Sequence, residues 1–181
     1  MIVYLEHEAF HISLTLLPYV LLILLAVTEF SDAVDGYLAR KYNQVTDLGK
    51  LLDPMADSIC RISVFLTFTQ PPVQIPMVLV FIFLYRDSVV STIRTICALK
   101  GFALAARSSG KIKAVVQGLT ALAIVLMMIP YTMGMISLDD LQRASTLVVG
   151  VACLYTVFSG FEYIYANRHY IGKMLQPVSS Q

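Results

Sequence analysis

The stretch DAVDGYLARKYNQVTDLGKLLDPMAD, from Asp32 to Asp57, holds five aspartates, one arginine and two glycines. The chain around it is apolar: of its 181 residues 57% are hydrophobic and 14% are charged, and its mean hydropathy is +0.74. A soluble domain carries about 25% charged residues. The composition therefore indicates a membrane protein. Charge is costly inside a membrane, so the acidic stretch needs a functional explanation.

Five apolar runs are long enough to cross a bilayer as helices, which takes about 20 residues each. The expected fold class is an all-α integral membrane protein, a helical bundle with five transmembrane helices. One membrane-embedded domain is expected over residues 1–173, followed by a disordered tail over residues 174–181. The apolar runs cover residues 12–31, 52–70, 73–97, 114–134 and 144–166.

Positive residues sort the loops between these runs into two sides. The loops after runs one, three and five carry nine lysines and arginines, whereas Arg143 alone represents the other side. Cytoplasmic loops carry an excess of Lys and Arg. We therefore expect the acidic stretch to face the cytoplasm from the cell (inner) membrane. The net charge of +1 gives no reason to expect a nucleic-acid partner.

The acidic stretch is predicted to form two helices joined by a short turn. Residues 32–42 continue the helix of the first run, and the chain is expected to turn near residues 43–46. A second helix then begins with Thr46 or Asp47 as its N-cap. At about 100° per residue, the functional candidates fall on one side of each helix. They are Asp32, Asp35, Gly36, Ala39 and Arg40 on the first helix, and Gly49, Asp53 and Asp57 on the second.

Because the connection is short, the two helices are neighbours, and four carboxylates can converge between them. Four carboxylates at the edge of a low-dielectric region cannot all stay ionised without counter-charge, and one arginine supplies too little. Divalent cations are the natural counter-charge, and ligands that are all oxygen suit Mg²⁺, Mn²⁺ or Ca²⁺ rather than zinc. Two such ions about 3.5–4 Å apart form a clamp for phosphoryl chemistry.

The pattern Asp32-x2-Asp35-Gly36-x2-Ala39-Arg40-x8-Gly49-x3-Asp53-x3-Asp57 resembles the signature of the CDP-alcohol phosphatidyltransferases. The resemblance implies a helical, dimeric membrane enzyme, normally with six spans. Such an enzyme displaces CMP from a CDP-linked lipid with the hydroxyl of an acceptor.

The resemblance also assigns roles to these residues. Asp57 is the implied general base. The CDP part of the lipid is implied to contact Asp32, Gly36, Ala39, Arg40, Gly49 and Asp53. Two ions, Mg²⁺ or Mn²⁺, are implied to bind Asp32, Asp35, Asp53 and Asp57.

A second segment bears on the acceptor. The third run contains LYRDSVVSTIRT, and SSGKIKAVVQ follows it. This combination is similar to the phosphatidylglycerophosphate synthase branch of the family, in which an Arg-Glu…Arg segment precedes Gly-Lys-x-Lys. The match implies CDP-diacylglycerol and glycerol 3-phosphate as substrates, and phosphatidylglycerophosphate and CMP as products. The implied pocket for the acceptor phosphate contains Arg86, Arg94, Lys111, Lys113 and Tyr163.

Alternatives stay open for this pocket. Lys111 and Lys113 also fit ordinary anchoring on the cytoplasmic side, and Tyr163 also fits an interfacial belt. Arg86 and Asp87 also fit a structural ion pair inside the bundle. The acceptor could instead be an inositol phosphate or, in a cardiolipin synthase, phosphatidylglycerol.

The chain departs from the branch in three respects. Only 31 residues precede Asp32, so we expect the first span of the family to be missing. Ser58 stands where the branch often has Lys, and Asp87 replaces the usual Glu.

Two functions other than phosphatidyl transfer fit parts of the sequence. His7 and His11 form H-E-x-x-H, a zinc-protease motif, but a protease leaves Asp53 and Asp57 without a role. The other rival is a non-catalytic membrane scaffold, which the complete aspartate set argues against.

Overall fold

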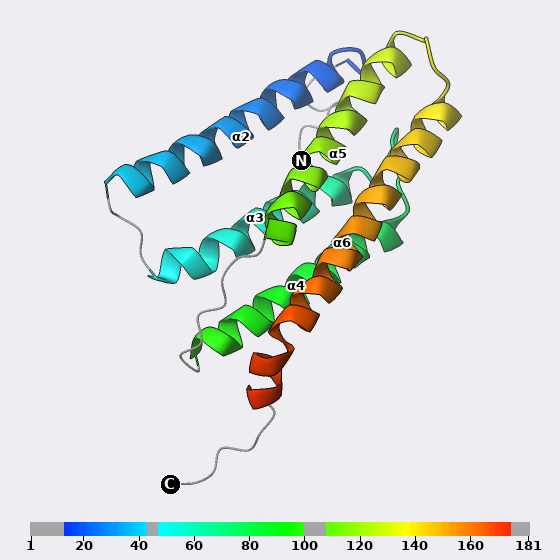
Figure 1. The fold of residues 1–181 in the computed structure, drawn as a ribbon. Coiled ribbons are helices and arrows are strands. Elements are labelled where there is room, and N and C mark those ends of the chain that lie inside the picture. The colour runs from blue at the N-terminus through cyan, green and yellow to red at the C-terminus, as the bar shows by residue number, and fades with distance from the viewer. Residues whose placement is uncertain (1–12, 43–46, 100–107, 175–181) are drawn as a thin grey trace, which may run out of the picture.

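The computed structural model describes residues 13–42, 47–99 and 108–174, and within them the chain is all helical (Figure 1). Each of the five predicted runs corresponds to one helix, which confirms the all-α expectation. The helices are α2 (Leu17–Lys41), α3 (Asp47–Thr67), α4 (Met77–Leu99), α5 (Ser108–Thr132) and α6 (Leu138–Met174).

Membrane character is strongest in the second half of the chain. Among the described residues, the segments Ser108–Thr132 and Leu138–Gly172 are long and apolar enough to cross a membrane. In α2 the apolar part is shorter, Leu17–Ser31, because the acidic half follows it. The number of membrane spans therefore remains a prediction.

Helix α2 runs without interruption from Leu17 to Lys41, so its apolar half continues directly into its acidic half. Asp32 and Asp35 thus lie on a helix whose first turns are anchored in the bundle by Leu17 and Leu21, both buried. The next helix begins at Asp47, as predicted. The expected turn at residues 43–46 lies outside the described residues.

Helix α6 organises the packing. It lies against α4 and α5, while α3 packs on α4 and α5, and α2 packs on α5 (Figure 1). The rings of Phe65 in α3 and Phe83 in α4 meet with their centroids 4.9 Å apart in the core. Together these contacts hold α3, α4, α5 and α6 around one end of the bundle.

Small residues let α6 approach its neighbours closely, as is usual between membrane helices. At Gly160, an added Cβ would lie 3.0 Å from Cγ of Arg86, so the arginine lies flat against the α6 backbone. Ser145, Ala152, Thr156 and Ser159 are buried on α6 in the same way. Many large side chains of α6, among them Leu147, Leu154, Phe158 and Phe161, face outward instead, where we expect lipid.

The start of α6 precedes the predicted residue 144 because the chain caps the helix earlier. The Ser137 hydroxyl accepts a hydrogen bond from the Asp140 backbone N–H at 3.1 Å and donates one to Asp140 Oδ2 at 2.7 Å. Gly134 permits the preceding turn with φ at 73°. Local capping therefore adds two turns that apolar character alone did not predict.

Candidate functional site

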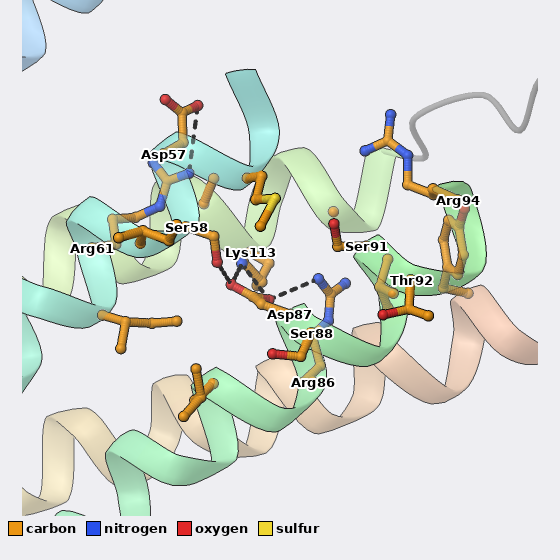
Figure 2. A pocket seen from close by; sticks show the side chains of 18 of the residues that line it. Asp57, Ser58, Arg61, Arg86, Asp87, Ser88, Ser91, Thr92, Arg94 and Lys113 are labelled. Atoms are coloured by element: carbon orange, nitrogen blue, oxygen red, sulfur yellow. Dashed lines mark hydrogen bonds and ion pairs between the residues drawn. The ribbon is translucent and has the colours of Figure 1, made fainter. Parts of the chain in front are cut away.

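A cavity of about 510 Å³ lies among α3, α4, α5 and α6 (Figure 2). Apolar side chains from α3 and α4 form part of its wall. The ionisable residues in its wall are Asp57, Arg61, Arg86, Asp87, Arg94, Lys111, Lys113 and Tyr163. Five cations thus face two carboxylates, so the cavity suits an anionic ligand.

Asp87 lies at the centre of the cavity wall and is 9% exposed. The Lys113 ammonium donates to both of its carboxylate oxygens, with each N–O distance 2.8 Å. Arg86 donates from Nη1 to Oδ1 at 3.1 Å, and the Ser58 hydroxyl donates to Oδ2 (Figure 2). Two cations therefore neutralise this carboxylate, as a buried charge requires.

Arg86 also connects α4 to α6. Its Nη2 donates to Ser159 Oγ at 2.6 Å, next to the close approach at Gly160. The ion pair between Arg86 and Asp87, left open from the sequence, is therefore present, and Lys113 joins it. These contacts give Arg86 a structural task beside any contact with a ligand.

Two further cations at the same cavity have no partner among the described residues. Arg94 lies near the end of α4, and Lys111 lies in the first turn of α5. Within the described part of the chain, neither side chain has a hydrogen bond or an ion pair. The Tyr163 hydroxyl is likewise without a partner there, although the residue is only 4% exposed. These three side chains leave donors available to a ligand.

Asp57 occupies the α3 side of the cavity, and its side chain is 50% exposed. Arg61, one turn further along α3, places Nη2 3.7 Å from Asp57 Oδ2. Asp57 is therefore an accessible carboxylate with a weakly held counter-ion. That combination leaves its oxygens available to a cation or to a substrate proton.

The other three aspartates lie on the same pair of helices. Asp35 is six residues before the end of α2, and Asp53 is six residues after the start of α3. At 1.5 Å per residue, both lie about 9 Å along their helix from the turn, while Asp32 and Asp57 both lie about 14–15 Å from it. The aspartates therefore lie at similar distances along their helices from the ends that the turn joins, but the packing partner of α2 is α5, so their convergence between α2 and α3 stays a prediction.

The metal hypothesis fits this donor set by its chemistry, since every candidate ligand is a carboxylate. Asp57 is the one member whose side chain the structure describes. Among the described side chains, no three His, Cys, Asp or Glu residues lie together. The side chains of Asp32, Asp35 and Asp53 lie outside that description, so the metal assignment stays a prediction.

The structure brings all the predicted acceptor-pocket residues to one cavity together with Asp57, while their roles remain predictions. The surroundings of Gly36, Ala39, Arg40 and Gly49 are outside the description, as are residues 7–11 with the H-E-x-x-H motif. Sequence reasoning missed the parts played by Ser58 and Arg61. The signal for Arg61 was its helical spacing of four from Asp57.

Comparison with known proteins gives consistent matches over most of the chain. A sequence profile described as CDP-alcohol phosphatidyltransferase matches residues 8–164. The CDP-diacylglycerol–glycerol-3-phosphate 3-phosphatidyltransferase of Bacillus subtilis is 34% identical over 145 residues, which cover 80% of this chain and 72% of the relative. The protein of the same name from Rickettsia felis is 31% identical over 165 residues, covering 90% and 86%. A CMP-forming cardiolipin synthase of Streptomyces coelicolor is 39% identical over 67 residues, covering 37% and 31%.

The Asp87 contacts predict that replacing Asp87 lowers the stability of the protein far more than replacing Asp57. Asp87→Asn leaves Lys113 and Arg86 without their shared counter-charge inside the bundle, a loss of about 3–5 kcal/mol for a buried pair. Asp57→Asn removes a half-exposed carboxylate and should change stability little. Thermal unfolding in detergent should show a clearly lower midpoint for the Asp87 variant alone. Equal midpoints for the two variants would contradict a structural role for the Asp87 network.

Proposed function

We propose the following reaction for this chain, which belongs to the CDP-alcohol phosphatidyltransferase family: transfer of a phosphatidyl group from CDP-diacylglycerol to glycerol 3-phosphate, giving phosphatidylglycerophosphate and CMP. The observation that carries the proposal is a cavity shared by an accessible carboxylate, Asp57, and two uncommitted cations, Arg94 and Lys111. The printed names of the relatives from Bacillus subtilis and Rickettsia felis support the same substrates.

The chemistry assigned to Asp57 is that of a general base. It accepts the proton of the acceptor hydroxyl as that oxygen forms a bond to the β-phosphorus, which carries the lipid. The bond between this phosphorus and the bridging oxygen breaks, and CMP leaves with the electron pair. Two divalent ions, Mg²⁺ or Mn²⁺, would neutralise charge on the diphosphate when bound. Asp32, Asp35, Asp53 and Asp57 would hold them.

The CDP end of the donor lipid lies, in this proposal, between α2 and α3. Gly36, Ala39 and Gly49 are small and let a nucleotide diphosphate approach the backbone. Arg40 supplies a guanidinium for a phosphate oxygen. Asp32 and Asp53 complete the contact set as metal ligands that also face the nucleotide.

The acceptor end lies near Arg94 and Lys111, whose charges suit a dianionic phosphate. Lys113 has three ammonium donors, of which Asp87 uses two, so one remains for the acceptor. The buried hydroxyl of Tyr163 provides another donor. Arg86 contributes mainly by orienting Asp87, with its charge still facing the cavity.

We further propose that this chain crosses the cell's inner membrane five times and forms a homodimer, with the cavity open to the cytoplasm. The loops rich in lysine and arginine support this orientation, because such loops are usually cytoplasmic. Arg94 at the end of α4 and Lys111 at the start of α5 lie at that same end of the bundle.

A second acceptor deserves a test because of the cardiolipin synthase match, which covers about a third of this chain. In that enzyme class the acceptor would be phosphatidylglycerol. The uncommitted cations favour an acceptor with its own terminal phosphate, which phosphatidylglycerol lacks.

The deciding experiment is an acceptor screen with purified protein and labelled CDP-diacylglycerol in mixed micelles. We expect phosphatidylglycerophosphate with glycerol 3-phosphate, loss of product with EDTA, and recovery with Mg²⁺ or Mn²⁺. Product formed with phosphatidylglycerol or inositol phosphate instead would replace the proposed acceptor. Absence of CMP release with every acceptor would support a scaffold, and zinc-dependent peptide cleavage would support the protease.

Removing the base should separate turnover from binding. Asp57→Asn should lower kcat by about 100-fold or more, the scale of general-base catalysis, while binding of CDP-diacylglycerol partly survives. Asp139→Asn, at the exposed start of α6, is the matched control and should keep wild-type activity. Equal turnover for Asp57→Asn and wild type would remove Asp57 from the base role.

Removing an acceptor cation should act on one substrate. Arg94→Gln should raise the KM for glycerol 3-phosphate by about tenfold or more, since a charged hydrogen bond is lost. The KM for CDP-diacylglycerol should stay within about twofold. Arg143→Gln makes the same chemical change on the opposite side and should alter neither constant. An unchanged acceptor KM in Arg94→Gln would take Arg94 out of the pocket.

A further inference from the structure

Arg61 is a cation of the cavity that the reaction described above does not use. Its closest anionic group among the described residues is Asp57, at 3.7 Å, beyond hydrogen-bond distance. Its Nε is buried and has no hydrogen-bond partner within the described part of the chain. The side chain is 26% exposed and lines the cavity. A guanidinium with five donors is therefore held at the cavity wall without a hydrogen bond to any residue that the structure describes.

The other central cations differ from Arg61 because their charged ends are hydrogen-bonded. Lys113 and Arg86 both donate to Asp87, and Arg86 also donates to Ser159, although its Nε, like that of Arg61, is buried without a partner among the described residues. Buried donors are normally satisfied, so the unpartnered Nε of Arg61 at the cavity wall indicates a missing acceptor group. The planar fork of arginine matches two oxygens of one phosphate, a geometry that a lysine cannot provide.

The position of Arg61 indicates which phosphate this is. In Figure 2, Arg61 lies beside Asp57, while Arg94 lies on the far side of the Asp87 contacts. A base must lie about 2.6–3.2 Å from the oxygen whose proton it takes. That oxygen attacks a phosphorus about 3–3.5 Å away in a reactive complex. A guanidinium next to Asp57 is therefore close to the phosphoryl group in transfer, whereas Arg94 is placed for the other end of the acceptor.

We propose that Arg61 is a further catalytic residue, whose guanidinium binds the non-bridging oxygens of the phosphoryl group during its transfer. The proposal rests on the proposed function for the chemistry of the step. The acceptor oxygen bonds to phosphorus, the bond to the bridging oxygen of CMP breaks, and the proton passes to Asp57. Arg61 changes no bond. Its hydrogen bonds strengthen as charge spreads over the phosphoryl oxygens, which stabilises the transition state.

Before substrate binds, the same guanidinium lies beside the Asp57 carboxylate. This contact joins a half-exposed carboxylate to a partly exposed arginine four residues apart on one helix, at 3.7 Å, and such pairs are weak. A phosphoryl group can therefore displace it readily. Arg61 then leaves Asp57 free to accept the proton.

The test is steady-state kinetics of Arg61→Gln and Arg61→Lys with both substrates varied. For Arg61→Gln we expect kcat to fall about 100-fold, the scale of losing one transition-state donor group, with both KM values within about threefold of wild type. Arg61→Lys keeps the charge without the fork and should lose about tenfold in kcat. Arg168→Gln, an exposed arginine of α6 outside the cavity, should match wild type.

Thermal unfolding in detergent, with and without CDP-diacylglycerol, checks the fold of each variant. If Arg61→Gln does not fold, Arg61→Lys decides the question, since wild-type kcat in that variant overturns the proposal. A kcat for Arg61→Gln within threefold of wild type also overturns it. So does a raised acceptor KM at unchanged kcat, which assigns Arg61 to the acceptor's own phosphate.

A failure of the proposed function would be distinguishable from a failure of this inference. Wild-type protein that uses another acceptor contradicts glycerol 3-phosphate, but the phosphoryl group in transfer is the same. The kcat comparison is then made with that acceptor.

Discussion

Charge inside an apolar helical bundle has to be neutralised where it stands, and this constraint shapes the part of the bundle that contains the cavity. Asp87 shows how the chain meets it: one carboxylate from α4 is held by Lys113 of α5 and Arg86 of α4, with Ser58 of α3 as a further donor. The contacts tie three helices together at one point. An ion pair this deeply buried is costly to break, so it fixes the relative placement of those helices.

The rest of the cavity follows from that placement. Arg86 lies against the α6 backbone at Gly160 and donates a hydrogen bond to Ser159 of the same helix. The arginine that holds Asp87 therefore also holds α6 at the cavity. Asp57 lies on the exposed side of α3. It shares the cavity wall with cations that do not contact Asp87. The chain thus separates charges that neutralise each other from charges that remain for a ligand. We infer that the α2 and α3 aspartates meet the same constraint by taking divalent cations from solution.

The sequence predicted much of the helical architecture, because long apolar runs leave few alternatives. Helix ends were less predictable. Asp140 and Ser137 cap α6 earlier than apolarity indicates, whereas the continuation of α2 from apolar into acidic residues was predicted. Arg86, Arg94, Lys111, Lys113 and Tyr163 were all predicted as one pocket and do line one cavity. The bonding of Lys113 to Asp87 was not predictable from spacing, since the two residues are 26 positions apart and meet through tertiary packing. The spacing of four between Asp57 and Arg61 could have indicated their ion pair, but the buried, unpartnered Nε of Arg61 was visible only in the structure.

The central claim is that carboxylates of α2 and α3 share a pair of metal ions. Electron paramagnetic resonance of Mn²⁺ added to the purified protein with CDP-diacylglycerol measures this directly. Two ions about 3.5–4 Å apart are magnetically coupled, so we expect two bound Mn²⁺ per chain and a coupled spectrum. The coupled signal should disappear in Asp53→Asn. A spectrum of isolated Mn²⁺, or of free Mn²⁺ alone, would show that the aspartates do not form a common centre, and would contradict the account.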